Sequence, residues 1–68
     1  MNAIDRHVGM RMRLRRSMLG LSQDRLARLL GCDEARITDM EDGTCRVSAA
    51  ELVALAGTLR VPIRWFYE

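Results

Sequence analysis

The residues with the most evident chemistry in this 68-residue chain are its eleven cations, all of which are arginine. Four of them lie between Arg11 and Arg16, whereas five acidic residues lie within residues 33–42. A guanidinium makes bidentate contacts with phosphate that an ammonium cannot make. With a net charge of +2, the composition permits nucleic-acid binding without requiring it, and an all-arginine set is equally typical of a biased genome composition.

The residues that catalysis or metal binding would need are missing. The chain has one histidine, His7, and two cysteines, Cys32 and Cys45, too few for a zinc site with four Cys and His ligands. No nucleophile with a base and no pair of catalytic carboxylates stands out. We therefore expect no enzyme activity, no metal and no cofactor, and interpret both cysteines as free thiols that pack as small apolar residues.

Length and hydropathy limit the architecture. A chain of 68 residues fits one domain, residues 1–68, with one small core, and its single Trp, Phe and Tyr make that core largely aliphatic. No apolar run approaches the roughly 18 residues that cross a bilayer, and the start does not resemble a secretion signal. We expect a cytoplasmic protein without membrane contact.

Helical spacing and capping residues predict five short helices. We expect them over residues 5–19, 22–30, 33–41, 48–59 and 62–67. Asp5 and Ser22 are placed as N-caps, Ser48 and Glu51 have the spacing of a capping box, and Pro62 stands where a last helix can begin. The residues expected to face the core are Val8, Met12, Leu19, Leu26, Leu29, Leu30, Ile37, Met40, Leu52, Leu55, Ala56 and Leu59.

The segment from Ser22 to Met40 has the most specific pattern. Two short helices that meet at about 90 to 120° need a small residue where their backbones approach and a turn residue that can adopt positive φ. Ala27 and Gly31 supply these two features, and Ile37 and Met40 help to close the angle from inside. The segment therefore predicts a helix-turn-helix.

With this motif the chain resembles the phage-repressor and Cro-like helix-turn-helix transcriptional regulators of the xenobiotic-response-element type. The resemblance rests on "VGMRMRLRR", "GLSQDRLARLLG", "MEDG" and "RVSAAELVALAGTLRVPIRWF" and covers about Val8 to Glu68. It implies an all-α, lambda-repressor-like DNA-binding domain whose helix at 33–41 enters the major groove of double-stranded DNA. It also implies a homodimer on a palindromic operator, and no small-molecule ligand is evident.

Five side chains are expected to contact the phosphate backbone. These are Gln23, Arg36, Arg46, Arg11 and Arg13. The resemblance assigns Gln23 to the exposed N-terminus of the second helix, where free amides and the helix dipole also attract an anion, and Arg46 to a loop that contacts phosphate. Arg36 is added because it lies near the first turn of the third helix.

The resemblance places four residues where the family reads base edges: Glu34, Ala35, Thr38 and Asp39. Their chemistry departs from the family pattern, because carboxylates accept only from cytosine amino groups and otherwise repel phosphate. A second function therefore stays open, in which the chain is a protein-interaction module that keeps the fold but binds DNA weakly or not at all.

Three further roles follow from the resemblance. Arg16 and Glu41 correspond to an internal ion pair that joins the third helix to the first. Arg60 stands where the family has glycine after the fourth helix, which costs about 1 kcal/mol if that position needs positive φ. The candidate dimer interface is Ile63, Trp65 and Tyr67, together with Phe66 unless that side chain belongs to the core.

Overall fold

The computed structural model describes residues 3–68 and contains four α-helices followed by one 3₁₀ turn. The elements are α1 (Ala3–Met18), α2 (Gln23–Leu30), α3 (Glu34–Asp42), α4 (Ala49–Leu59) and η1 (Ile63–Tyr67). The described residues include no strand, so the all-α prediction is confirmed. The expected fifth α-helix is wrong, because the last segment is the 3₁₀ turn η1.

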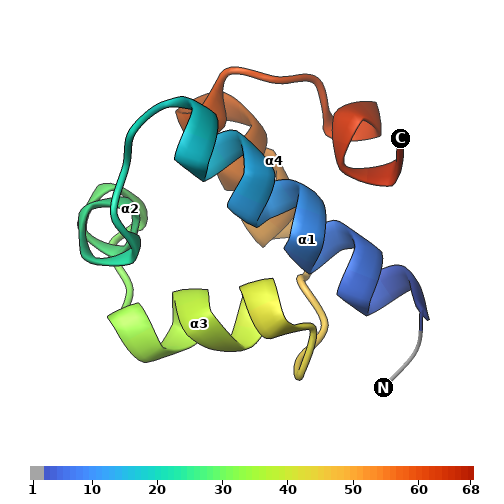
Figure 1. Ribbon diagram of the computed structural model, residues 1–68, viewed down its shortest axis with the longest axis horizontal. Helices are drawn as coiled ribbons and strands as arrows, with labels where there is room; N and C mark the ends of the chain where they lie inside the picture. Colours follow the sequence, from blue (N-terminus) through green and yellow to red (C-terminus); the bar gives the residue numbers. More distant parts are fainter. Residues whose placement is uncertain (1–2) are drawn as a thin grey trace.

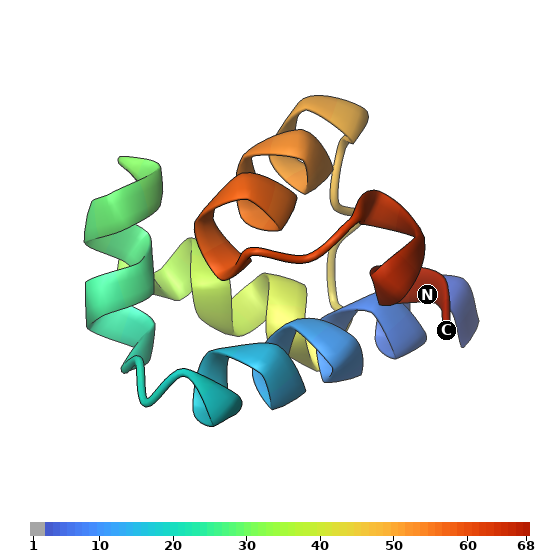
Figure 2. The ribbon, with the colours of Figure 1, turned by 90° about the horizontal axis from the view of Figure 1, so that it is seen from above.

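Helix α1 is the long element on which the others are arranged. It packs against α3 on one side and against η1 on the other, while α2 contacts both α3 and α4. Figure 1 shows α4 behind α1, with α3 running along the lower edge and α2 seen almost end-on. In the perpendicular view of Figure 2, α2 stands at one end of the molecule and η1 lies over α1 near the other.

Local capping signals account for most helix boundaries. The Ser22 hydroxyl accepts a bond from the Arg25 amide at 3.0 Å, and both bonds of the predicted capping box between Ser48 and Glu51 are present. Asp5 was predicted to be an N-cap, and this prediction is wrong. Helix α1 already runs from Ala3, so Asp5 lies in its first turn, where a negative charge still suits the helix dipole.

The end of α4 explains why no fifth α-helix follows. Arg60 adopts a left-handed conformation with φ 60° and ψ 49°, as expected if its position needs positive φ. Pro62 is then extended, and its carbonyl accepts the Trp65 amide at 3.0 Å, a bond between residues three apart. Five residues closed by such bonds form a 3₁₀ turn, the usual outcome for so short a segment.

One apolar core joins all five elements. Its buried members are Val8, Met12, Leu26, Ala27, Ile37, Met40, Leu52, Leu55, Ala56, Leu59 and Phe66. Two predicted core residues, Leu19 and Leu29, are instead exposed. Leu19 follows Met18, the last residue of α1, and α2 packs inward through Leu26 and its neighbours, which leaves Leu29 on its outer edge.

Three further features concern the described residues. None of the helices there has the length and apolar character that a bilayer-spanning helix needs. In the same part of the chain, no group of three His, Cys, Asp or Glu side chains could hold a metal ion. Cys32 and Cys45 are free thiols, half-buried against the core.

Candidate nucleic-acid interface

The corner between α2 and α3 is held by backbone bonds and by apolar packing. Gly31 adopts φ 71° and donates to the Arg28 carbonyl at 3.3 Å, and Cys32 donates to the Ala27 carbonyl at 3.0 Å. A residue with a β-carbon would be strained at that positive φ. Ala27 and Ile37 are buried inside the angle. The corner therefore fixes the direction in which α3 leaves α2.

Gly9 lets α1 approach the backbone of α3. A β-carbon at this position would overlap the Met40 carbonyl oxygen and lie 2.6 Å from the Glu41 carbonyl oxygen. The missing side chain therefore sets the distance between α1 and the C-terminal half of α3. Nothing in the spacing of the sequence marked Gly9, because a glycine inside a helix has no signal that distinguishes close packing from tolerance.

The Glu41 carboxylate joins three helices. Its side chain is fully buried, and Arg16 binds it with two bonds, Nε to Oε2 at 2.6 Å and Nη2 to Oε1 at 3.1 Å. Gln23 Nε2 donates to Oε1 at 2.9 Å, and Arg13 Nε approaches the same oxygen at 3.4 Å. Arg16 and Glu41 thus form an ion pair that links α1 to α3. The hydrogen bond from Gln23 connects α2 to the same carboxylate.

Two opposing effects act on Glu41. Burial favours the neutral acid and would raise its pKa, but the hydrogen bonds from Arg16 and Gln23, together with the charge of Arg16, outweigh burial and lower the pKa below its usual value. The hydrogen bond to Glu41 likewise raises the pKa of Arg16, despite burial. Both groups are therefore charged at neutral pH, and their attraction contributes to folding.

Acid is expected to remove this contribution. Because folding lowers the pKa of Glu41, the stabilisation is fully present above the unfolded pKa, about 4.3, and is lost as the pH falls through the lower pKa of the folded protein. Denaturant titrations from pH 7 to about pH 2 should show this loss, and Glu41→Gln should show a shallower acid limb. Equal acid limbs in both proteins would contradict the assignment.

The outer face of α3 exposes the predicted base-reading residues. Glu34, Ala35 and Asp39 are exposed, and within residues 3–68 neither the Glu34 nor the Asp39 carboxylate has a hydrogen bond or ion pair. Thr38 is half-buried, and its hydroxyl donates to Gln23 Oε1 at 3.1 Å. The structure therefore brings these four positions together on one face, next to the start of α2.

Gln23 has both ends of its carboxamide engaged. Its oxygen accepts from Thr38, and its nitrogen donates one hydrogen to Glu41. An amide nitrogen carries two hydrogens, so one remains for a ligand. The side chain predicted to grip phosphate is thus held in a fixed orientation at the first residue of α2.

Arg36, predicted to contact phosphate, has partners inside the domain. Its guanidinium turns toward α4, where Nη2 lies 2.6 Å from Glu51 Oε1 and Nε 2.9 Å from Oε2. Nη1 also donates to the Cys45 thiol at 2.9 Å. The hydrogen bond from Arg36 is the main cause that lowers the pKa of Glu51. Arg36 therefore joins α3 to α4, and this geometry does not support the predicted phosphate contact.

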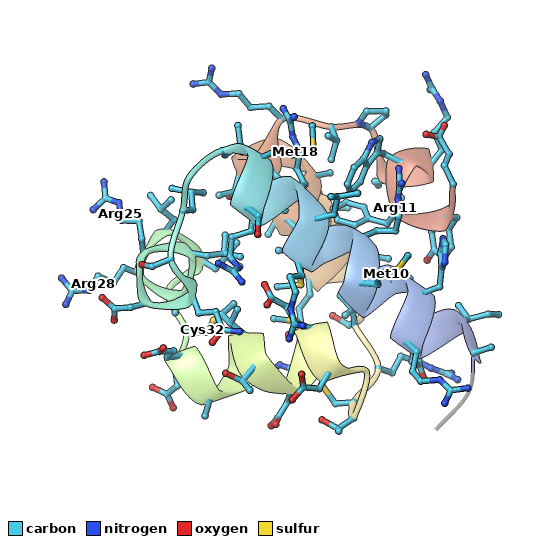
Figure 3. The ribbon with its side chains drawn as sticks, in the orientation of Figure 1. Met10, Arg11, Met18, Arg25, Arg28 and Cys32 are labelled. Atoms are coloured by element: carbon cyan, nitrogen blue, oxygen red, sulfur yellow. The ribbon has the colours of Figure 1, made fainter. Side chains whose placement is uncertain are left out.

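Arg11 is also directed inward. Its guanidinium lies 3.8 Å from the centre of the Trp65 ring, and Nε donates to the Trp65 carbonyl at 3.0 Å. Figure 3 shows Arg11 pointing from α1 toward η1. Such a stacked cation with a short carbonyl contact holds the C-terminal segment on α1. Arg11 thus has a structural role, and this geometry does not support the predicted phosphate contact.

Comparison with known proteins shows which family has the α2–α3 corner described above. The family model described as "Helix-turn-helix domain" matches residues 7–64, most of the chain. The chain belongs to the helix-turn-helix family. A solved structure with the same fold is the restriction-modification controller protein C.AhdI from Aeromonas hydrophila, with TM-score 0.89 and 34% identity over 96% of this chain and 98% of that one.

Curated relatives of this helix-turn-helix domain bear regulator names. An uncharacterized HTH-type transcriptional regulator of Sinorhizobium medicae (strain WSM419) is 48% identical over 67 residues, which are 98% of this chain and 48% of that protein. An uncharacterized transcriptional regulator in the ATPase CF(0) region of Rhodospirillum rubrum is 44% identical over 65 residues, 96% of this chain and 60% of that protein. The chain spans about half the length of the curated relatives it matches.

Other arginines of the helix-turn-helix domain remain exposed. The Arg46 side chain is 74% exposed, with Nε 3.7 Å from Asp5, and Arg13 bridges to Asp42 at 3.2 Å. Arg25 and Arg28 project from α2 into solvent in Figure 3. Arg25 has no partner for its guanidinium in the described residues. It was not among the predicted phosphate contacts, because no motif position in the sequence distinguishes it.

The predicted dimer patch divides into two parts. Ile63 and Tyr67 are exposed, whereas Phe66 is fully buried in the core of the helix-turn-helix domain. Trp65 is half-buried between Arg11 and Phe66, and the Trp65 and Phe66 rings are nearly perpendicular with their centres 5.6 Å apart. Phe66 is therefore a core residue, and Ile63 and Tyr67 are the members of the patch that a second molecule can reach.

Proposed function

We propose that this chain is the DNA-binding part of a transcriptional regulator that occupies an operator as a homodimer, with α3 in the major groove. The observation that carries the proposal is the division of α3 into two faces. Ile37, Met40 and Glu41 fix its inner face, and the side chains of Glu34 and Asp39 are left free outside. A helix held this way can present its outer residues to base edges.

The phosphate contacts of the proposal follow from exposure. Gln23 contributes its second amide hydrogen at the start of α2, and Arg46, Arg13 and Arg25 contribute charge. Arg36 and Arg11 are left out because their guanidinium groups bind within the domain and their side chains are only 34% and 18% exposed. Arg13 and Arg46 also pair with carboxylates of the domain, but their side chains stay 54% and 74% exposed. Phosphate contacts of this kind fix the register of a protein on DNA, while the outer face of α3 selects sequence.

Replacing Arg46 with alanine should weaken binding to all duplexes alike. Loss of one phosphate contact is expected to flatten the slope of log affinity against log salt concentration by about 0.9. Fluorescence polarisation at several salt concentrations measures this slope. Arg64→Ala is the matched control, because Arg64 is 79% exposed but lies on η1, away from α2 and α3. A slope that changes equally in both variants would remove Arg46 from the contact set.

The proposed homodimer can be tested on the same purified protein. Two recognition helices related by a two-fold axis read half-sites about one helical turn apart, whereas one helix alone reads few base pairs. Light scattering with and without a palindromic duplex measures the oligomeric state of the protein. A monomer under both conditions would remove the dimer from the proposal while leaving DNA binding intact.

The acidic outer face of α3 favours one alternative, a protein-interaction module that has little affinity for DNA. Unpaired carboxylates at Glu34 and Asp39 would repel phosphate unless they accept from cytosine amino groups. This repulsion would act on every duplex, whatever its sequence. The two functions therefore predict different results when the carboxylates are removed.

We expect Glu34→Gln to reduce the preference for cytosine at one operator position by roughly 1 to 3 kcal/mol, because the carboxylate reads that base. Sites selected from random DNA, followed by affinity measurements, give this preference. The double variant Glu34→Gln with Asp39→Lys distinguishes the alternative. If it binds every duplex more tightly and Glu34→Gln alters no preference, the carboxylates only repel, and the interaction module is the better description.

A further inference from the structure

Helix α1 carries an exposed apolar stripe that the fold does not use. Met10, Leu14 and Met18 follow one another at intervals of four residues and therefore share one helix face. Their exposed fractions are 52%, 45% and 63%. Met10 and Met18 mark the ends of the stripe in Figure 3. Single exposed apolar residues are ordinary, but three large ones in a row form a continuous surface.

Helix α1 packs against the rest of the domain through its opposite side. Val8 and Met12 are buried in the core, and Gly9 lies against the backbone of α3. The stripe of Met10, Leu14 and Met18 therefore contributes little to folding. Its methionines are unbranched and polarizable, properties that suit a surface that adapts to a partner.

Arginines border the stripe on both edges. Arg6 and Arg13 lie seven residues apart along one edge, where Arg13 reaches α3. Arg11 and Arg15 lie four residues apart along the other edge, where they donate to the carbonyls of η1 and of the end of α4. Arg13 and Arg11 are paired with carboxylates, those of Asp42 and Glu68, so the uncompensated charge of the border comes from Arg6 and Arg15. Within the described residues Arg6 has no partner, and the one hydrogen bond of Arg15 goes to a carbonyl that carries no net charge. The border is therefore basic.

The basic border decides which occupant fits. Two copies of α1 packed antiparallel through Leu14 would bring like edges together, so arginine would face arginine. Phosphate would satisfy the arginines but leave the apolar stripe in water. A helix with apolar residues at the same spacing and acidic residues on its flanks satisfies both. We propose that the Met10–Leu14–Met18 stripe docks an acidic amphipathic helix of a partner protein.

A pair of designed helical peptides tests this docking on the full chain. Both have leucine at positions i, i+4 and i+8, and one carries glutamate on its flanks where the other carries lysine. Fluorescence anisotropy should show that the glutamate peptide binds and that the lysine peptide binds at least about tenfold more weakly. Leu14→Ser should lower the affinity for the glutamate peptide about tenfold, since it removes one leucine contact that the bound peptide would bury.

The matched control is Val53→Ser, because Val53 is an aliphatic residue of α4 that is 60% exposed and lies outside the stripe. It should leave peptide affinity unchanged. Equal affinity for both peptides, or no effect of Leu14→Ser, would overturn the proposal. Two further results would also overturn it: binding to phosphatidylserine vesicles but not to the glutamate peptide, which indicates a membrane surface, and dissociation of a dimer by Leu14→Ser, which indicates a second copy.

Discussion

Gly9→Ala is expected to lower the free energy of unfolding by about 3 kcal/mol, the upper end of the usual cost of overpacking. The added methyl group would meet the backbone carbonyls of Met40 and Glu41, which cannot rotate away as a side chain can. The melting temperature should fall by roughly 12 to 24 °C for a domain of this size. Urea denaturation and calorimetry of the purified variant measure both quantities.

Gly57→Ala is the matched control for this prediction. Gly57 lies inside α4, and apart from the adjacent residues and the nearby backbone of its own helix, a β-carbon there would meet no atom within 4 Å. Alanine favours an exposed helix interior over glycine by up to about 1 kcal/mol, so this variant should be as stable as the parent or more stable. If Gly9→Ala were equally harmless, α1 and α3 would not approach as closely as described.

Glu41→Gln is the second change with a large expected effect. The two side chains have nearly the same size, but the amide replaces one acceptor oxygen with a donor among four donor contacts from Arg13, Arg16 and Gln23. It also leaves the Arg16 charge half-buried without a counter-ion. Breaking such a pair from one side costs about 3 kcal/mol. The expected loss therefore exceeds that of any exposed ion pair in the domain.

Arg28→Ala provides the comparison. Arg28 pairs with Asp24 one turn away at 3.2 Å, and both side chains are exposed, so this pair is worth at most about 0.5 kcal/mol. Chemical denaturation of both variants at pH 7 gives the two losses under the same conditions. A Glu41→Gln loss no larger than that of Arg28→Ala would show that the buried carboxylate does not hold the three helices together.

Short-range signals allowed the sequence to predict much of the fold. The Ser22 cap, the Ser48–Glu51 capping box and the Gly31 turn all depend on residues within a few positions of one another, and the structure has each of them. The last segment was predicted as an α-helix because Pro62 suits a first turn. In five residues, however, bonds between positions three apart prevail.

The partners of the arginines at the candidate site could not be predicted from such short-range signals. Whether Arg36 reaches solvent or Glu51 depends on how α3 and α4 pack, and the two residues are fifteen positions apart. Arg11 likewise meets Trp65 across 54 positions. Arginine side chains are long and flexible, so composition and spacing cannot indicate which of several neighbours each will bind. The resemblance could name a position, but only the fold shows the direction of the side chain.

The two faces of α3 bear different evolutionary constraints. Substitution at Ile37, Met40 or Glu41 disturbs the core or the buried carboxylate, so these positions tolerate little change. Glu34, Ala35 and Asp39 are exposed, and the fold sets almost no limit on their identity beyond helix propensity. Lineages that share this scaffold can therefore diverge in what they recognise through a few surface substitutions, without compensating changes in the interior.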